Sequence, residues 1–371
     1  MRKKLLNTKK KQNDQISVLH TAQMRVPSIG FIKQMEFEQR AANSLGINWD
    51  SRIYSKQGIS SKVVIEHNTY SKFKHSFFKW LNTQQENYDV ILLRYKPYDP
   101  MQTKFVKQCP LPVITMHHTI EIHELKGIGN IRSRVLAEVE KAIGTRTLRH
   151  TTAIAGVTEE IVNHQRLRSG CPNKPTLLYS NGAWYDESHQ LKPRIRTKIP
   201  EFLFLSSKFP NWLGLDLLFD SANKTDSEFK VHLVGYLTNE QNIQANKDGR
   251  FIVHGVLDSK GIEEIIARST LGLGTFGAHR KNFTEGNTLK VREYLHKGLP
   301  VYSGQPEKAL TDLAFFCHGP ACFENILEFA NSINNIDRME VSEVARPLID
   351  KRIILETMYE KIGNIVLDKT S

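Results

Sequence analysis

The sequence predicts an α/β protein of two domains, each built around a parallel sheet, with the two sheets facing a central cleft. The first observation is that apolar runs of strand length alternate with helical runs, which is typical of parallel sheets. The second is that this alternation occurs twice, with a polar, basic segment at residues 186–200 as a linker between the halves. A chain of 371 residues is also long enough to build two domains with separate cores.

The first half of the chain predicts a domain over residues 16–185, after a basic tail at residues 1–15. It opens with a strand at 16–20, and an amphipathic helical run follows at 31–45, where Gly46 ends it. Further strands are predicted at 52–54, 62–66, 90–95, 112–117, 152–156 and 176–179. Helices are expected in most of the intervals between these strands.

The alternation starts again after the linker and predicts a second domain over residues 201–337. Its strands are predicted at 202–205, 230–234, 251–254 and 270–276, and its helices at 213–223, 262–267 and 289–296. The last segment, residues 338–371, is predicted to be helical over most of its length. Because ligands of open α/β sheets bind beyond the carboxyl ends of the strands, chemistry is expected in the loops after His117, Leu205, Val234 and Phe276.

The composition limits the classes of partner and the location of the protein. The net charge of +12 predicts attraction to an anionic surface, which leaves nucleic acid, acidic lipid and phosphorylated substrates as candidates. The chain lacks a zinc-finger or aromatic RNA-binding signature, so no nucleic-acid partner is predicted. It also lacks an apolar run of bilayer-spanning length and a secretory signal, which predicts a cytoplasmic protein. The basic tail is either a solvated segment or a peripheral contact with anionic lipid at the inner face of the membrane.

Several motifs that would carry other chemistry are missing from the sequence. The chain contains no Asp-x-Asp pair, no Gly-x4-Gly-Lys-Ser/Thr phosphate loop, no Gly-x-Ser-x-Gly elbow and no His-Glu-x-x-His. Its four cysteines are too scattered for a disulfide framework or a zinc site. The sequence therefore predicts chemistry that is independent of metal ions and of a cofactor.

The most specific motif is a pair of carboxylates, Glu285 and Glu293, separated by seven residues where a predicted strand is followed by a predicted helix. Thr284, Asn287 or Thr288 is expected to cap that helix. The backbone N–H groups of its first turn lack partners within the helix and favour an anion such as a phosphate. Glu285 then faces the ligand from the loop, and the Glu293 carboxylate accepts hydrogen bonds from ribose or hexose hydroxyls. The alternative is that both glutamates are solvated surface acids.

This run resembles the Glu-x7-Glu signature of the retaining group 1 (family 4) glycosyltransferases. The matching positions are Glu285, Gly286, Leu289, Glu293, Gly298, Leu299, Pro300 and Val301. Asn287 and Thr288 stand where the family usually has an aromatic residue and a glycine. Gly182 and the run 156–160 resemble two further segments of the family, so the resemblance extends over most of residues 16–335.

The resemblance implies a GT-B fold, in which two Rossmann-like domains face a cleft and the last helix, here within residues 338–371, packs back on the first domain. It implies a glycosyltransferase that moves a hexose-type sugar from a nucleotide diphosphate sugar to an acceptor hydroxyl, with retention of anomeric configuration. The second domain is expected to hold the donor and the first domain a saccharide or lipid-linked acceptor. Cell-surface polysaccharide or glycolipid biosynthesis is the implied setting.

For the donor, the resemblance implies that Glu293 binds the ribose hydroxyls and that Glu285 contacts the transferred sugar. The diphosphate is expected to meet the loop and the first helical turn, which comprise Gly286, Asn287, Thr288, Leu289 and Lys290. Lys208 aligns with the family's phosphate-binding arginine, whereas Leu213 replaces its lysine. We expect Lys208 to stabilise the charge on the leaving phosphate, and Lys290 to supply the second positive charge.

For the acceptor, the candidates lie at strand ends of the first domain. His117 and His118 end one predicted strand, where the family places one histidine. The sequence leaves open which of them faces the site, and His118 is favoured as the catalytic one. Gly30 is expected in a loop where the backbone approaches a ligand. Arg94, at the end of another strand, is expected to contact charge on the acceptor.

Three alternatives remain beside this interpretation. Residues 272–277 formally match the dinucleotide fingerprint Gly-x-Gly-x-x-Gly, but they overlap a strand late in the chain and no amphipathic helix follows, which disfavours a dinucleotide site. A nucleotide-sugar epimerase of the same fold fits the same donor residues. A non-catalytic protein that binds sugar or polyanion also fits, because Leu213, Asn287 and Thr288 depart from the family pattern.

Overall fold

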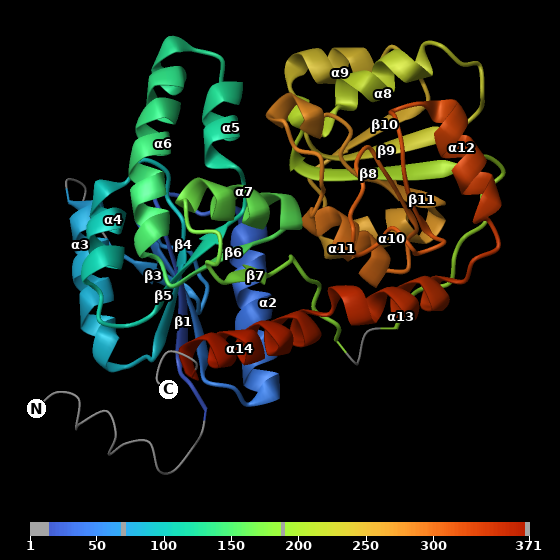
Figure 1. The fold of residues 1–371 in the computed structure, drawn as a ribbon. Coiled ribbons are helices and arrows are strands. Elements are labelled where there is room, and N and C mark those ends of the chain that lie inside the picture. Colours follow the sequence, from blue (N-terminus) through green and yellow to red (C-terminus); the bar gives the residue numbers. More distant parts are fainter. Residues whose placement is uncertain (1–14, 68–71, 187–189, 368–371) are drawn as a thin grey trace, which may run out of the picture. The chain divides into compact units, whose positions relative to one another are not determined.

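The structure is a computed structural model, and the residues that it describes are 15–67, 72–186 and 190–367. The chain divides into two compact units (Figure 1). Unit 1 comprises Met1–Tyr179 with Ile354–Ser371, and unit 2 comprises Ser180–Ile353. The predicted basic tail lies, apart from Gln15, outside the described residues. Among the helices that are described, none is long and apolar enough to cross a bilayer.

Unit 1 is built on a seven-stranded sheet of parallel strands in the order β3-β2-β1-β4-β5-β6-β7. The strands are β1 (Val18–Met24), β2 (Trp49–Ser55), β3 (Val64–Glu66), β4 (Val90–Arg94), β5 (Val113–His117), β6 (Ala153–Gly156) and β7 (Thr176–Leu178). The α-helices are α2 (Ile29–Leu45), α3 (Phe73–Thr83), α4 (Pro100–Gln108), α5 (Glu121–Gly127), α6 (Ile131–His150), α7 (Glu159–Ser169) and, at the end of the chain, α14 (Lys351–Leu367). Every strand predicted for this half is present, with ends that differ by a few residues.

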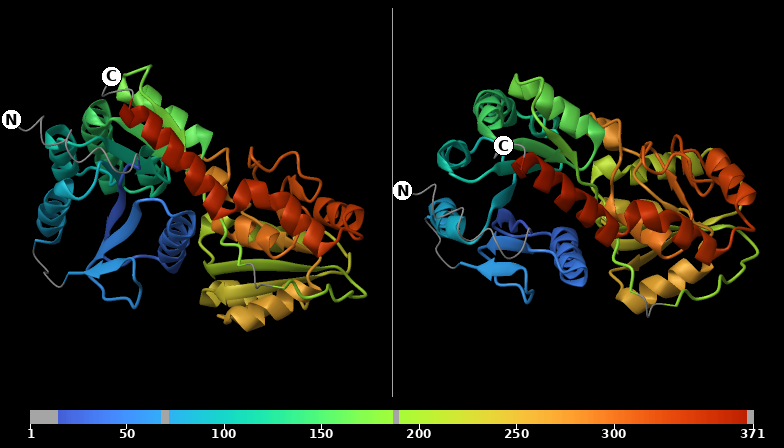
Figure 2. Two further views of the ribbon diagram at one scale, coloured as in Figure 1. Left: turned by 90° about the horizontal axis from the view of Figure 1, so that it is seen from below. Right: turned by 60° about the horizontal axis from the view of Figure 1, so that its bottom comes forward.

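Helices cover both faces of this sheet (Figures 1 and 2). Successive residues of a strand point to opposite faces, and β2 shows the consequence. Tyr54 packs in a cluster that includes apolar residues of α3 and α4, whereas its neighbour Ile53 packs with residues of α2. The central strand β4 is accordingly buried over residues 90–93, as expected of a parallel strand that is covered on both sides.

Helix α2 begins and ends at residues with clear local signals. The Ser28 side chain accepts a hydrogen bond from the Phe31 N–H at the start of the helix. At its end, Gly46 adopts a left-handed φ of 65°, and its N–H donates to the Ala42 carbonyl. The helix therefore ends at the predicted glycine but starts two residues earlier than predicted, so Gly30 lies in its first turn and not in the preceding loop.

Unit 2 is built on a six-stranded parallel sheet in the order β10-β9-β8-β11-β12-β13. The strands are β8 (Glu201–Lys208), β9 (Lys230–Tyr236), β10 (Phe251–Gly255), β11 (Leu271–Leu273), β12 (Val301–Ser303) and β13 (Phe316–His318). The α-helices are α8 (Leu215–Ala222), α9 (Asn239–Ala245), α10 (Ser259–Arg268), α11 (Leu289–His296), α12 (Phe323–Ser332) and α13 (Arg338–Ile349). An aromatic core lies on one face of this sheet, where the rings of Phe229 and Phe323 stack with centroids 4.0 Å apart.

The elements of unit 2 differ from the predicted ones in two respects. The strand predicted at 270–276 is shorter, because Phe276 leaves the sheet and its N–H donates to the Leu213 carbonyl. In addition, strand β13 and helices α9 and α12 are present but were not predicted.

The boundary between the two units also differs from the predicted domain boundary. The division falls between Tyr179 and Ser180, before the predicted domain end at residue 185. Residues 190–200, the described part of the predicted linker, form no helix or strand and belong to unit 2, where the Ile195 N–H donates to the Ala267 carbonyl.

The C-terminal segment is two helices. Asp350 separates α13, which belongs to unit 2, from α14, whose residues from Ile354 onward belong to unit 1. The Asp350 carboxylate accepts a hydrogen bond from the Arg352 N–H in the first turn of α14.

Candidate functional site

The Glu285–Glu293 motif lies in unit 2 and runs from the loop after η3 (Ala278–Lys281) into helix α11. Glu285 is in the loop, and Glu293 is in the second turn of α11, as predicted from the sequence. Thr288 is the N-cap residue, with an extended backbone, but its side chain forms no capping hydrogen bond. The Thr288 side chain therefore leaves the N–H groups of the first turn, beginning with Leu289, without an N-cap hydrogen bond, and N–H groups at this position in a helix favour an anion.

The loop before α11 is fixed to the segment after β12 by several contacts. The Gly286 N–H donates to the Pro306 carbonyl at 2.9 Å, and the Gln305 side-chain amide donates to the Phe283 carbonyl. A Cβ atom at position 286 would meet the Glu307 side chain at 3.2 Å, so the loop passes that residue closely. The backbone N–H of Gly286, expected to meet the diphosphate, is thus engaged within the protein.

A buried ion pair also helps to hold this loop in place. The Arg292 guanidinium donates to the Glu307 carboxylate, and both side chains are only 2% exposed. Burial raises the pKa of the Glu307 carboxyl above its ordinary value, although Arg292 and the Thr288 N–H hold it in the charged form and oppose this rise. The charge of Glu285 adds to the rise, so the two carboxylates lie near each other. The sequence did not identify Arg292 or Glu307, because nothing local indicates that they pair.

Asn287, which departs from the family pattern, joins the loop to the start of unit 2. Its side-chain oxygen accepts a hydrogen bond from the Asn181 N–H at 3.0 Å, and its carbonyl accepts one from the Asn181 side-chain amide at 2.7 Å. Asn181 lies in the run that resembles another segment of the family, and its role was not predicted. The departure at position 287 therefore has a structural role in positioning the loop.

The two lysines proposed for the diphosphate lie in different environments. Lys208 is exposed at the end of β8. Lys290 has its Nζ atom buried above the Phe204 ring, 4.6 Å from the centroid, and the described residues offer this atom no hydrogen-bond partner. Burial lowers the pKa of Lys290 to about 7. Leu213, at the position of the family's lysine, is 1% exposed in the core of unit 2.

The glycine run at 272–277 has a packing explanation. A side chain at Gly272 would collide with the Tyr294 ring, one at Gly274 with Ser303, and one at Gly277 with the Asn211 carbonyl. These glycines let β11 and the loop after it approach α11, β12 and the loop after β8 closely. The arrangement accounts for the fingerprint match without a dinucleotide.

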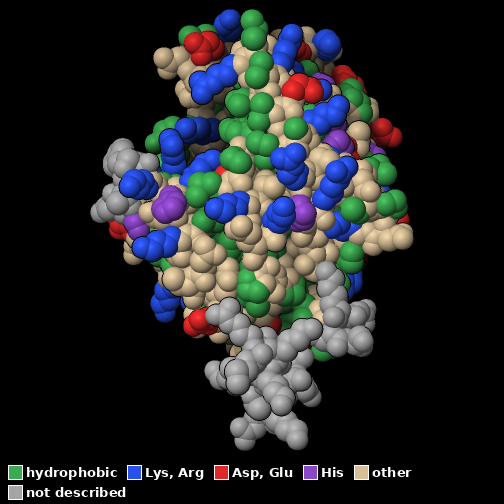
Figure 3. All heavy atoms as spheres, turned by 60° about the vertical axis from the view of Figure 1, so that its left-hand side comes forward, with side chains coloured by type: hydrophobic (Ala, Val, Ile, Leu, Met, Phe, Trp, Pro, Cys, Tyr) green, Lys and Arg blue, Asp and Glu red, His purple; other side chains and the backbone are tan. Residues whose placement is uncertain are grey.

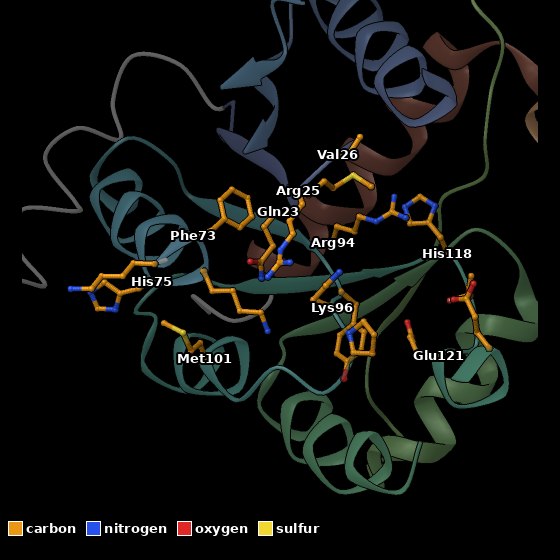
Figure 4. Close-up of a pocket in the computed structure, with 17 residues that line it drawn as sticks. Gln23, Arg25, Val26, Phe73, His75, Arg94, Lys96, Met101, His118 and Glu121 are labelled. Atoms are coloured by element: carbon orange, nitrogen blue, oxygen red, sulfur yellow. The ribbon is translucent and has the colours of Figure 1, made fainter. Parts of the chain in front are cut away.

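A cavity of about 890 Å³ opens in unit 1 at the carboxyl ends of β1, β4 and β5 (Figure 4). Arg94 and His118, two of the predicted acceptor residues, line it, and Figure 4 shows the Arg94 side chain directed toward His118. The Arg94 guanidinium lies 4.1 Å from the centre of the Phe31 ring, and the His118 ring meets Phe31 edge-on. Gly30, in the first turn of α2, is not among the residues that line the cavity.

His117 is fully buried, is not among the residues that line this cavity and lies in a polar network. Its Nδ1 atom lies 2.7 Å from Glu121, its Nε2 atom 3.2 Å from Thr115, and its ring stacks on Tyr95. Burial alone would raise the pKa of the Glu121 carboxyl, but His117 and Arg168 outweigh it and hold the pKa below its ordinary value. The position of His117 therefore fits a structural role, whereas His118 lies at the cavity.

Comparison with known proteins identifies the fold. No family model matches the chain, and no curated protein matches it. Among solved structures, a glycosyltransferase from Rickettsia africae matches with a TM-score of 0.65 and 14% identity, over 96% of this chain and 99% of that one. Anabaena HepE in complex with UDP-glucose matches with a TM-score of 0.64 and 14% identity, over 94% and 100%. The lipopolysaccharide outer core galactosyltransferase WaaB matches with a TM-score of 0.63 and 12% identity, over 95% and 99%.

The same architecture occurs in a putative UDP-N-acetylglucosamine 2-epimerase from Listeria monocytogenes, with a TM-score of 0.56, 12% identity and coverage of 96% and 98%. At these identities the comparisons show the fold alone. The chain has the GT-B fold, with two parallel-sheet α/β units, as predicted.

Proposed function

We propose that this chain is a glycosyltransferase that moves a hexose-type sugar from a nucleoside diphosphate sugar to an acceptor hydroxyl, with retention of anomeric configuration. The observation that carries the proposal is the loop around Glu285, which hydrogen bonds fix at the start of α11, where the Thr288 side chain forms no cap, with Glu293 one turn further on. The likeness to a structure of HepE with bound UDP-glucose supports this choice of donor. The likeness to WaaB supports a role in cell-surface polysaccharide or glycolipid synthesis.

In this proposal the residues of unit 2 bind the donor. The Glu293 carboxylate accepts hydrogen bonds from the ribose hydroxyls, and Glu285 contacts the transferred sugar. The N–H groups of the first turn of α11, from Leu289, bind the diphosphate, and the exposed Lys208 adds positive charge where negative charge develops on the leaving phosphate. Because the Gly286 N–H donates to Pro306, the helix and not the glycine supplies the amides.

The proposed transfer needs no covalent intermediate on the protein. The acceptor oxygen forms a bond to the anomeric carbon on the face from which the phosphate leaves, and the bond from that carbon to the phosphate oxygen breaks. The acceptor proton passes to the departing phosphate. We propose that this occurs in the cytoplasm, with the basic tail at residues 1–15 reaching anionic lipid at the inner face of the membrane.

A second candidate function is epimerisation of a nucleotide sugar, because a putative epimerase shares the fold. The two functions differ in their requirement for an acceptor. An epimerase converts the donor sugar by itself, whereas a transferase releases the nucleoside diphosphate in proportion to the acceptor that is glycosylated.

The donor site is tested by thermal melting of the full chain with UDP, GDP, ADP, TDP and CMP. A ligand that binds only the folded protein raises the melting temperature, and at about 100 times its Kd it adds about 2.7 kcal/mol of stability. We expect one nucleoside diphosphate to stabilise the wild type and Glu264→Ala, an exposed control in α10, but not Glu293→Ala. A cooperative melt that none of the five ligands shifts would contradict the proposal and favour the non-catalytic alternative.

Turnover is tested with the nucleotide that emerges from this screen. Glu285→Ala is expected to keep binding the nucleotide while donor turnover falls by about 100-fold or more, because the variant loses a contact to the reacting sugar. Turnover of the wild-type protein in the absence of any acceptor, with conversion of the donor sugar, would instead identify an epimerase.

A further inference from the structure

The cavity of unit 1 carries an excess of positive charge that the donor chemistry does not use. Its cationic lining residues are Arg25, Lys72, Lys74, Arg94 and Lys96, and its acidic ones are Glu121 and Glu124. Figure 3 shows the side of the molecule that carries α3, α4 and α6, where Lys and Arg side chains far outnumber carboxylates. A concave surface lined by charge of one sign concentrates ligands of the opposite sign.

Most of these cations have no carboxylate partner among the residues that the structure describes. Lys74 pairs with the buried Asp99 at 3.1 Å. For Arg25, Lys72, Arg94 and Lys96, the described part of the chain provides no carboxylate oxygen within 4.0 Å. These four residues come from three segments of the chain that meet at one cavity. Arg25 follows β1, Lys72 precedes α3, and Arg94 and Lys96 lie at the end of β4.

The two acids of the cavity, Glu121 and Glu124, offset only part of this charge. Glu121 already faces His117 at 2.7 Å and Arg168 at 3.8 Å, so its charge is directed into the polar network of unit 1. Glu124 accepts a hydrogen bond from the Thr119 hydroxyl at 3.1 Å, and its charge favours the charged form of Arg94. Because five cations line the cavity against these two acids, positive charge remains in excess.

The positions of Arg94 and Lys96 make this excess costly in the free protein. Burial lowers the pKa of Arg94 to about 10, although Glu124 and Glu121 oppose the shift, so the guanidinium is still charged at neutral pH. Lys96 is more exposed, but partial desolvation and the neighbouring charges of Lys74 and Arg94 lower its pKa as well. A bound anion would offset these repulsions, because it favours the charged form of each group.

We infer that this cavity recognises a phosphate group on the acceptor, with Arg94 and Lys96 as its main ligands and Arg25 as a further one. The acceptor role rests on the proposed glycosyltransferase function, whereas the binding of phosphate does not. A guanidinium fork matches the geometry of phosphate oxygens, and Arg94 is held in place by its contact with Phe31. The volume of about 890 Å³ is that of a small-molecule site, so the cavity accommodates a phosphorylated sugar or a phospholipid headgroup.

The test is calorimetric titration of the full chain, in excess UDP to fill the proposed donor site, with glucose 6-phosphate and with glucose. We expect binding of glucose 6-phosphate and none of glucose at the same concentration. Raising the NaCl concentration should weaken binding, because the attraction is electrostatic. Arg94→Gln and Lys96→Gln should each weaken it by about 10-fold, as expected for the loss of one hydrogen bond to a charged group.

Two controls keep the result interpretable. Lys96 is exposed, so Lys96→Gln and the double variant Arg25→Gln/Lys96→Gln test the cavity even if the more buried Arg94→Gln does not fold. Lys79→Gln removes an exposed lysine of α3 that does not line the cavity, and it should bind as the wild type does.

The source of the phosphate is distinguished by sedimentation with vesicles of phosphatidylglycerol and of phosphatidylcholine. If the protein binds phosphatidylglycerol vesicles but not glucose 6-phosphate, and Arg25→Gln/Lys96→Gln abolishes this binding, the cavity recognises a phospholipid headgroup. If it binds glucose 6-phosphate but neither kind of vesicle, the cavity recognises a soluble sugar phosphate. If neither binds, or if Lys79→Gln weakens binding as much as Lys96→Gln, the inference is wrong. This outcome is separate from the donor test, because nucleotide binding in unit 2 is measured with Glu293→Ala.

Discussion

At the scale of single residues, the candidate donor site depends on a pair that no motif indicates. Glu285 and Glu293 supply the carboxylates, but the loop between them is held by the buried Arg292–Glu307 ion pair. Two charges with 2% exposure have lost most of their hydration, so each depends on the other for compensation. Removing one of them leaves the other buried and unpaired.

The first prediction concerns this pair. Glu307→Gln is expected to lower the free energy of unfolding by about 3–5 kcal/mol, because the Arg292 charge stays buried without its partner. Urea denaturation measures the loss. The control is Arg280→Gln, which breaks the more exposed pair of Arg280 and Asp216 and should cost about 1 kcal/mol or less. Equal losses in the two variants would show that the buried pair does not support the fold as argued.

At the scale of elements, three neighbouring strands of unit 2 are joined by a chain of polar side chains. Glu201 begins β8, His232 lies in β9 and His254 in β10. The Nε2 atom of His232 is 2.8 Å from the Glu201 carboxylate, and its Nδ1 atom is 2.9 Å from Nε2 of His254. A carboxylate only accepts, so a neutral His232 donates to Glu201 and accepts from the His254 N–H. When both histidines are protonated, two N–H donors face each other and the contact between His232 and His254 is lost.

The second prediction is the pH dependence of this chain. Burial lowers the pKa of His232, although Glu201 opposes the shift, and burial and the charge of His232 lower that of His254. Both histidines therefore bind protons less readily in the folded protein than in the unfolded chain, where histidine has its ordinary pKa of 6.5. Their contribution to stability is present above this pH and is lost as the pH falls through and below it.

The measurement is the free energy of unfolding between about pH 7.5 and about pH 5.5, which is expected to fall for the wild type. His254→Gln should show a shallower fall, because it removes one of the two groups. His150→Gln, at the exposed end of α6, should keep the wild-type slope. If the free energy of unfolding of His254→Gln falls with pH as steeply as that of the wild type, His254 does not contribute to the pH dependence and the prediction is wrong.

At the scale of the whole molecule, the last helix of the chain packs on unit 1. Helix α14 presents Leu355, Met358 and Ile362 at helical spacing, and all three are fully buried. The Tyr359 hydroxyl donates to the carbonyl of Ile16, the residue two positions before β1, at 2.5 Å. The end of the chain thus stabilises the beginning of its first sheet, although the whole of unit 2 lies between them in the sequence.

The third prediction tests this packing. Leu355→Ala is expected to destabilise unit 1 by about 2–5 kcal/mol, because it removes buried apolar volume. Leu367→Ala changes the same residue type in the same helix at a position that is 53% exposed, and it should have little effect. Hydrogen exchange measures both, and faster exchange of β1 in Leu355→Ala alone is the expected result. Unchanged exchange in β1 would mean that α14 does not stabilise the sheet.

Several features of the fold and the site follow from the sequence because their causes are local. Apolar periodicity, with Gly298 and Pro300 after the last residue, predicted α11 at the bounds that the structure shows, and Gly46 marked the end of α2. The spacing of Glu285 and Glu293 placed one in a loop and the other one turn inside a helix. These signals act over a few residues, so one stretch of sequence contains all of their information.

The tertiary structure alone decided which side chains meet. His117 and His118 are adjacent, and neighbouring residues at a strand end point in opposite directions, so the sequence predicted that they differ but not which one lines the cavity. Lys290 lies at the helix start as predicted, yet packing turned its ammonium over Phe204. The sequence determined the elements and the carboxylates that they carry. The order of strands in each sheet decided that Arg25, Arg94 and Lys96 share one cavity, because strands far apart in the chain become neighbours only when the sheet forms.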